Sequence, residues 1–83
     1  MSSTIDPEAI DLARLAAMLR DECGHRVLGP TVGRTRLRDE VVRHLGCSQL
    51  EGETLVDTMI GRGFIRSERA PDGQFEWLIE ANA

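Results

Sequence analysis

Glycine residues divide this chain into short segments, and their spacing constrains the fold more than any other feature. Gly24, Gly46 and Gly63 each follow a stretch in which apolar residues recur every three or four positions, and glycine commonly ends helices. The segment 25–34 holds two more glycines and a proline, which excludes a long helix there. We therefore expect three short helices separated by tight connections.

The first predicted helix begins at Asp6 and ends before the first of these glycines. Asp6 is a suitable N-cap residue, and Pro7 fits the first helical position. The side expected to face the core is an apolar stripe of Leu12, Leu15, Ala16, Leu19 and Cys23. Residues 1–5 are expected to be a flexible N-terminus, so the predicted single domain covers residues 6–80.

The second predicted helix begins at Thr35, which can cap it. A short strand at Val27–Leu28 or at Thr31–Val32 is expected to precede it. The core-facing residues of this helix are expected to be Leu37, Val41, Val42 and Leu45.

The third predicted helix begins with a capping box, in which two residues each satisfy a free backbone N–H of the other. Ser48 and Glu51 have the required residue types and spacing. At 100° per residue, one face of this helix has Gly52 at its centre and carries Leu55, Val56, Met59 and Ile60.

A β-hairpin is predicted after the third helix, because residues 71–73 read Pro-Asp-Gly, a strong turn signal. In its second strand, alternation places on one face Phe75, Trp77 and Ile79. The opposite face receives Gln74, Glu76 and Glu80. The predicted fold class is therefore α+β, with three helices and a C-terminal β-hairpin.

The composition of the chain is that of one small globular domain. It has 83 residues, of which 41% are hydrophobic and 29% charged. The formal net charge is −4 at pH 7, which repels nucleic acid at long range. No apolar run approaches the ~18 residues of a membrane span, and no secretory signal is visible. We expect a cytoplasmic protein without a membrane partner.

The predicted order of elements, together with one turn, resembles the winged helix-turn-helix superfamily. In the segment LGCS, residues 45–48, Gly46 makes the bend, Cys47 packs inward and Ser48 caps the next helix. The resemblance covers residues 35–79. It implies a winged-helix domain whose third helix enters the major groove of double-stranded DNA, and hence a small, dimeric transcriptional regulator.

The resemblance assigns roles to particular residues of this chain. Base contacts fall at the start of the third helix, on Gln49, Leu50, Glu53 and Thr54. Phosphate contacts fall at the start of the second helix and on the hairpin, on Thr35, Arg36, Arg38, Arg66 and Arg69. Arg34 joins this group, because segment 24–46 holds five arginines against two acids and arginine–phosphate contacts strengthen binding at low salt.

The third helix departs from the pattern of DNA-binding members, and this supports an alternative function. No arginine, lysine or asparagine lies between His44 and Arg62. Asp57, near the expected phosphates, would be repelled by them. Leu50, exposed among acids, suits a groove on a protein better than a duplex. The alternative is an acidic module, or an assembly subunit, that docks a basic protein partner through this face and does not bind DNA.

Other chemistries have weaker support in the sequence. Cys23, His25, His44 and Cys47 have metal-ligand residue types, but the two pairs close different helices and we expect them not to meet. No nucleophile–base arrangement and no phosphate loop is present. We therefore expect no enzymatic activity, no metal and no cofactor.

Overall fold

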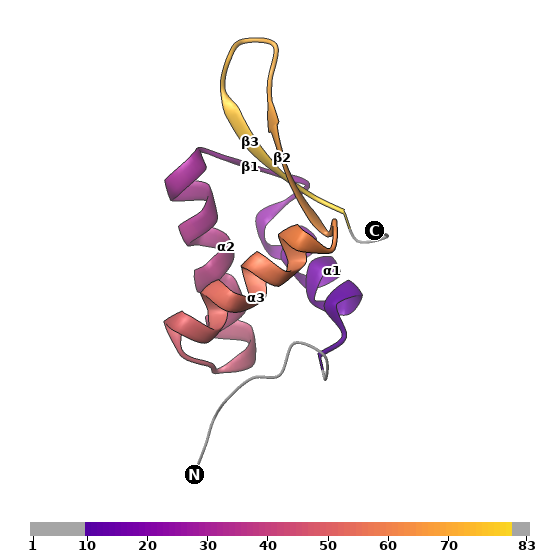
Figure 1. Ribbon diagram of the computed structural model, residues 1–83, viewed down its shortest axis with the longest axis vertical. Helices are drawn as coiled ribbons and strands as arrows, with labels where there is room; N and C mark the ends of the chain where they lie inside the picture. Colours follow the sequence, from indigo (N-terminus) through magenta and orange to yellow (C-terminus); the bar gives the residue numbers. More distant parts are fainter. Residues whose placement is uncertain (1–9, 81–83) are drawn as a thin grey trace.

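The computed structural model describes residues 10–80 and forms a small α+β domain, as predicted (Figure 1). It contains three helices and a three-stranded antiparallel sheet, a layout compatible with a winged helix. The elements in chain order are α1 (Leu12–Cys23), β1 (Arg26–Leu28), α2 (Pro30–Leu45), α3 (Gln49–Gly61), β2 (Ile65–Arg69) and β3 (Phe75–Ile79).

α1 begins later than the sequence analysis predicts. Asp11 is its N-cap: the backbone there is extended, and the carboxylate accepts a hydrogen bond of 3.1 Å from the Arg14 backbone N–H. The prediction that the helix already runs through Ile10 and Asp11 is therefore wrong, and the predicted cap at Asp6 lies outside the described residues. The predicted end is confirmed, since Gly24 has φ +85° and donates its N–H to the Arg20 carbonyl.

α2 begins earlier than predicted, at Pro30. Gly29 occupies the N-cap position with φ 92°, and a proline in the first turn loses no helical hydrogen bond. Thr35 consequently lies inside the helix, and its predicted capping role is wrong. The short strand forms at Arg26–Leu28, while Thr31–Val32 belongs to α2.

Gly33 explains why a helix tolerates this glycine-rich stretch. A Cβ at this position would lie 2.8 Å from the Leu28 backbone oxygen and 2.8 Å from Cδ1 of Trp77. The missing side chain therefore lets the start of α2 pack directly against β1 and β3. This contact outweighs the low helix propensity of glycine, about 1 kcal/mol relative to alanine.

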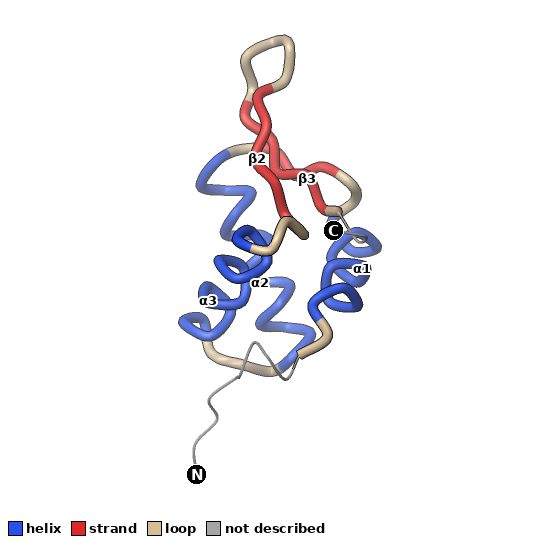
Figure 2. The backbone as a smooth tube through the Cα atoms, turned by 45° about the vertical axis from the view of Figure 1, so that its right-hand side comes forward, coloured by secondary structure: helices blue, strands red, loops and turns tan. Residues whose placement is uncertain are grey.

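The predicted hairpin is confirmed, and its second strand is the centre of the sheet. The strand order is β1-β3-β2, with both neighbours antiparallel to β3. Val27 and Ser67 both pair with Trp77. The β2–β3 hairpin, called the wing below, projects beyond the helices (Figures 1 and 2). In its turn the Gln74 N–H donates to the Asp72 carboxylate, at 3.0 Å.

The core lies between the three helices and one face of the sheet. The predicted apolar faces supply most of it, in the form of Leu12, Leu15, Ala16, Leu19, Val27, Leu37, Val41, Leu55, Val56, Met59, Ile65, Trp77 and Ile79. The Trp77 ring spans the junction with α2, because its Nε1 donates to the carbonyls of Gly29 (3.1 Å) and Pro30 (3.2 Å). The three helices therefore turn toward the core the faces that the spacing of their apolar residues predicts.

The opposite face of β3 is also covered, which the sequence analysis did not predict. Glu76 lies on this face as predicted but is only 8% exposed, and it accepts a hydrogen bond of 3.3 Å from Arg26 Nη1. Leu78 is buried as well, between its cross-strand neighbours Arg26 and Arg66. Long arginine stems cover apolar surface in this way while their charged ends reach water.

Candidate interaction surface

The start and orientation of α3 are set by the predicted capping box. The Ser48 hydroxyl accepts from the Glu51 backbone N–H at 3.1 Å, and the Glu51 carboxylate accepts from the Ser48 backbone N–H at 2.9 Å. Gly52 faces α2, where a Cβ would lie 2.7 Å from Cγ2 of Val42. The buried residues of α3 thereby fix which of its side chains point outward.

The outward side of α3 carries the residues predicted for base reading or docking. This surface, called the α3 face below, consists of Gln49, Leu50, Glu53, Thr54 and Asp57. Leu50 is 77% exposed, an unusually open position for a large apolar side chain. The Thr54 hydroxyl is turned back onto the helix, where it donates to the Leu50 carbonyl at 3.1 Å. Glu53 is half-buried, whereas Gln49, Thr54 and Asp57 are exposed.

The acids of the α3 face bind arginines that the sequence analysis assigned to phosphates. Arg34 forms an ion pair with Glu53 at 3.3 Å and a second one with Asp57. Arg38 lies 3.7 Å from Glu53 and 2.8 Å from its neighbour Asp39. The hydrogen bond that Arg34 donates to the Asp57 carboxylate raises the pKa of Arg34 above its usual range. The positive charges of Arg34 and Arg38 are therefore balanced by carboxylates of the same chain.

The other residues predicted to contact phosphates lie in two separate places. Thr35 and Arg36 are exposed on α2, and Arg36 lies beside the Cys23 thiol. On the wing, Arg66 binds Glu80 at 2.7 Å and lowers the pKa of that carboxyl. Arg69 donates to the Gly73 carbonyl in the wing turn, at 3.2 Å.

The predicted phosphate set therefore does not form one continuous positive surface. Within the described residues, Arg34, Arg38 and Arg66 each have a carboxylate partner. Exposed ion pairs are individually weak, but each places a negative charge where a phosphate would have to approach. The interhelical pairs are what sequence reasoning missed, because they depend on how α2 and α3 pack.

The cysteine and histidine residues do not assemble a metal site in the described part of the chain. No group of three or more histidine, cysteine or acidic residues between positions 10 and 80 is arranged to hold a metal ion. Burial raises the pKa of both thiols, Cys23 and Cys47, above the usual range. Both pack against the core, as predicted for Cys23 from the apolar stripe of the first helix and for Cys47 from its position in the turn.

Two exposed apolar residues near the wing were also missed by the sequence analysis. Leu28 ends β1 and Val32 lies in the first turn of α2, and their side chains are 57% and 76% exposed. The early start of α2 is what turns Val32 outward. No alternation or helical period signals this, because the boundary depends on the contact of Gly33 with the sheet.

Comparisons with protein families, with curated proteins and with solved structures find no match to this chain. Among the described residues, no helix has the length and apolar character that crossing a membrane requires.

Proposed function

We propose that this domain is a protein-interaction module that docks a partner through the α3 face. The observation that carries the proposal is the pairing of Arg34 and Arg38 with Glu53 and Asp57. In a helix that reads DNA, the arginines beside it face phosphates. Here the acids of the same helix occupy those arginines. Together with Asp39, three carboxylates surround the two guanidinium groups, so the surface around Leu50 is apolar and keeps a small excess of negative charge.

Leu50 is the anchor of the proposed interface. Its side chain is exposed at the start of α3, between Gln49 and the half-buried Glu51, and α3 contains three acids and no basic residue. An apolar side chain that fills a pocket, surrounded by polar groups, is a common form of interface hot spot. The complementary partner presents an apolar pocket with basic groups at its rim.

The first test is binding of a random-sequence DNA duplex, measured by fluorescence anisotropy from about 50 to 200 mM salt. We expect no binding at the low-salt end. Binding that weakens steeply over that range would mean that several arginine–phosphate contacts form, and it would overturn the proposal.

The second test places a photo-crosslinking amino acid at Gln49 and compares the chain with its Leu50→Asp variant in cells. A crosslinked partner that depends on Leu50 supports docking through the α3 face. Crosslinks that persist unchanged in the variant contradict it. Because Leu50 is exposed, the variant should unfold at the same temperature as the wild type in a circular dichroism melt.

A second candidate function, a DNA-binding regulator of the winged helix-turn-helix superfamily, is favoured by one observation. The wing projects from the helices (Figure 1), and its exposed strand β2 carries Arg66 and Arg69. Under this hypothesis the arginines outside α3 supply most of the affinity. Arg36→Ala and Arg66→Ala should then weaken duplex binding more than Gln49→Ala, and the opposite order would contradict it.

A further inference from the structure

α1 has an exposed side that the α3 face and the wing do not use. The buried residues of α1 all lie on one side of the helix. On the opposite side, spaced at three, four and seven positions, lies a second set of residues, called the α1 stripe: Arg14, Ala17, Met18 and Asp21. These spacings place the four side chains on one helical face.

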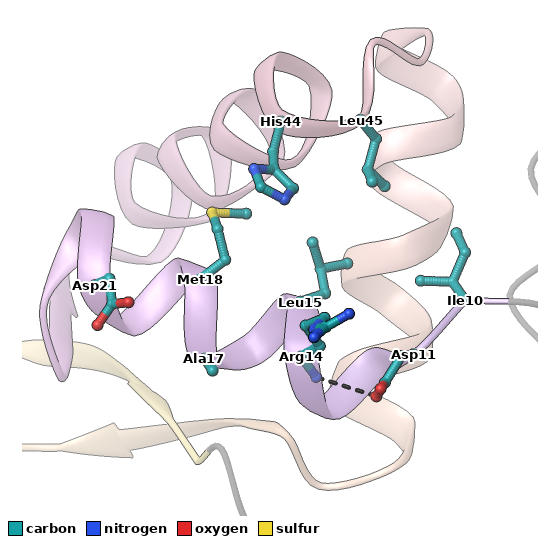
Figure 3. A pocket seen from close by; sticks show the side chains of 9 residues that line it. All are labelled: Ile10, Asp11, Arg14, Leu15, Ala17, Met18, Asp21, His44 and Leu45. Carbon is teal, nitrogen blue, oxygen red and sulfur yellow. Dashed lines mark hydrogen bonds between the residues drawn. The ribbon is translucent and has the colours of Figure 1, made fainter.

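Two hollows lie at the α1 stripe, and all four stripe residues line the larger one. The larger, about 550 Å³, lies between α1 and the end of α2, and Figure 3 shows Met18 and Leu45 among its lining residues. The smaller, about 250 Å³, is lined by Ala17, Arg20, Asp21 and His25. The stripe is therefore part of a concave, partly apolar surface, in which Met18 is half-buried.

The two charged residues of the stripe lack the pairing seen elsewhere on the surface. Arg34, Arg38, Arg43 and Arg66 all bind carboxylates. Neither Arg14 nor Asp21 forms an ion pair with any residue in the range 10–80, although both are exposed. They lie two turns apart on the same face, with opposite charges at the two ends of the stripe.

We infer that the α1 stripe is the contact surface of an antiparallel homodimer. A two-fold axis between Ala17 and Met18 sets Arg14 opposite Asp21 of the second copy, and the same pair repeats at the other end. The small Ala17 allows the helices to approach closely, and Met18 fills the irregular hollow of the second copy. A parallel arrangement would instead set Arg14 against Arg14, so the charges specify the orientation.

This contact is isologous, because the same residues serve both copies. It uses none of the residues of the α3 face, and it does not depend on the proposed docking function. Since exposed ion pairs contribute little, the dimer is weak, with a dissociation constant on the order of 10–100 µM.

The experiment is sedimentation velocity of the full chain over about 5 to 500 µM, a range that brackets the expected dissociation constant. The wild type should shift from monomer to dimer. Asp21→Arg should weaken association by about tenfold or more, because it opposes arginine to arginine at both ends. Arg14→Asp should do the same. The double variant Arg14→Asp/Asp21→Arg restores opposite charges and should return to within about threefold of the wild type.

The matched control is Glu68→Arg, which makes the same change in net charge on an exposed position of β2. It should leave the association constant unchanged, and circular dichroism should show native helix content in every variant. A wild type that remains monomeric at the highest concentration overturns the inference, and so does a double variant that associates no better than the single ones. Leu50→Asp should not alter the dimer, which separates this test from that of the docking function.

Discussion

α2 contacts the rest of the domain in two ways: by close packing on its inner side and by ion pairs on its outer side. Toward the interior, α2 meets the sheet at Gly33 and α3 at Gly52, where added methyl groups would lie within 3 Å of other atoms. Toward solvent, α2 meets α3 through Arg34 and Arg38, whose carboxylate partners Glu53 and Asp57 have side chains that are 39% and 67% exposed.

The difference separates what holds the fold from what defines the surface. A close-packed contact has no room to relax, so a single methyl group is costly there. Exposed charges are hydrated in both the folded and the unfolded state, so their pairing changes stability little. Substitutions at the inner contacts should therefore lower the stability of the domain, whereas substitutions at the outer contacts should change mainly what it binds.

The largest effect is expected at Gly33. Gly33→Ala brings a methyl group against a backbone oxygen, which cannot rotate away, and against the Trp77 ring. We expect a loss of about 3 kcal/mol in the free energy of unfolding. Urea denaturation followed by the fluorescence of Trp77, the single tryptophan, measures it. Equal stability of variant and wild type would show that the helix–sheet contact can relax.

A smaller loss is expected at Gly52, where the nearest atom belongs to the Val42 side chain. Gly52→Ala should cost about 1.5 kcal/mol, since the clash exceeds the gain in helix propensity of about 1 kcal/mol. Gly61→Ala is the matched control on the same helix, because a Cβ there meets nothing within 4 Å. Gly61→Ala should be neutral or stabilising. Equal losses of stability in both variants would mean that the loss at Gly52 does not come from the close contact with Val42.

Ser48→Ala tests the N-cap of α3, an exposed hydrogen bond that is neither a close-packed contact nor an ion pair. It removes the hydroxyl that accepts from the Glu51 N–H, and loss of an N-cap typically costs about 1 kcal/mol. Thermal denaturation by circular dichroism measures the loss. Ser48→Asp keeps an acceptor at the cap and should retain most of the stability, which distinguishes capping from a general effect of substitution.

The double variant Glu53→Gln/Asp57→Asn breaks the outer contact. We expect a stability change below about 1 kcal/mol, because the partners are partly exposed. Elution from a heparin column should nevertheless move to higher salt, since Arg34 and Arg38 become available to a polyanion. Glu68→Gln/Asp72→Asn changes the net charge equally on the wing and should shift elution less. An equal shift would mean that net charge alone controls binding.

The smallest effect concerns the exposed pair of Arg66 and Glu80 on the wing. Arg66 lowers the pKa of the Glu80 carboxyl in the folded state. The pair's small contribution to stability is therefore present above the usual carboxyl pKa and is lost as the pH falls through the lowered value. Arg66→Ala should return the pKa of Glu80 to its usual range in an NMR titration. An unchanged pKa would mean that the pair does not persist in solution.

Much of the fold was predictable because its signals are local. The capping box of α3, the helix-ending Gly24 and the wing turn are each encoded within a few residues. The start of α2 was not predictable, because it depends on Gly33 meeting Trp77, far along the chain. The burial of Glu76 likewise follows from the pairing of β1 with β3. That pairing cannot be predicted from the residue pattern of either strand alone.

The candidate site divides in the same way. Helical period alone predicted which residues of α3 point outward, including Leu50 and Asp57. It did not predict that Arg34 reaches across to Asp57, because that pair depends on the relative position of two helices. Assigning a charged residue to a ligand from sequence therefore requires first asking which partners the fold supplies.

The central position of β3 has a consequence for synthesis of the protein on the ribosome. β1 and β2 each pair with β3, which follows both of them in the chain, and the contact of Arg26 with Glu76 spans 50 residues. While β3 is still inside the ribosomal exit tunnel, neither emerged strand has its native neighbour. The three helices are the part of the nascent chain that can assemble first, and both strand pairings of the sheet have to wait until β3 has emerged.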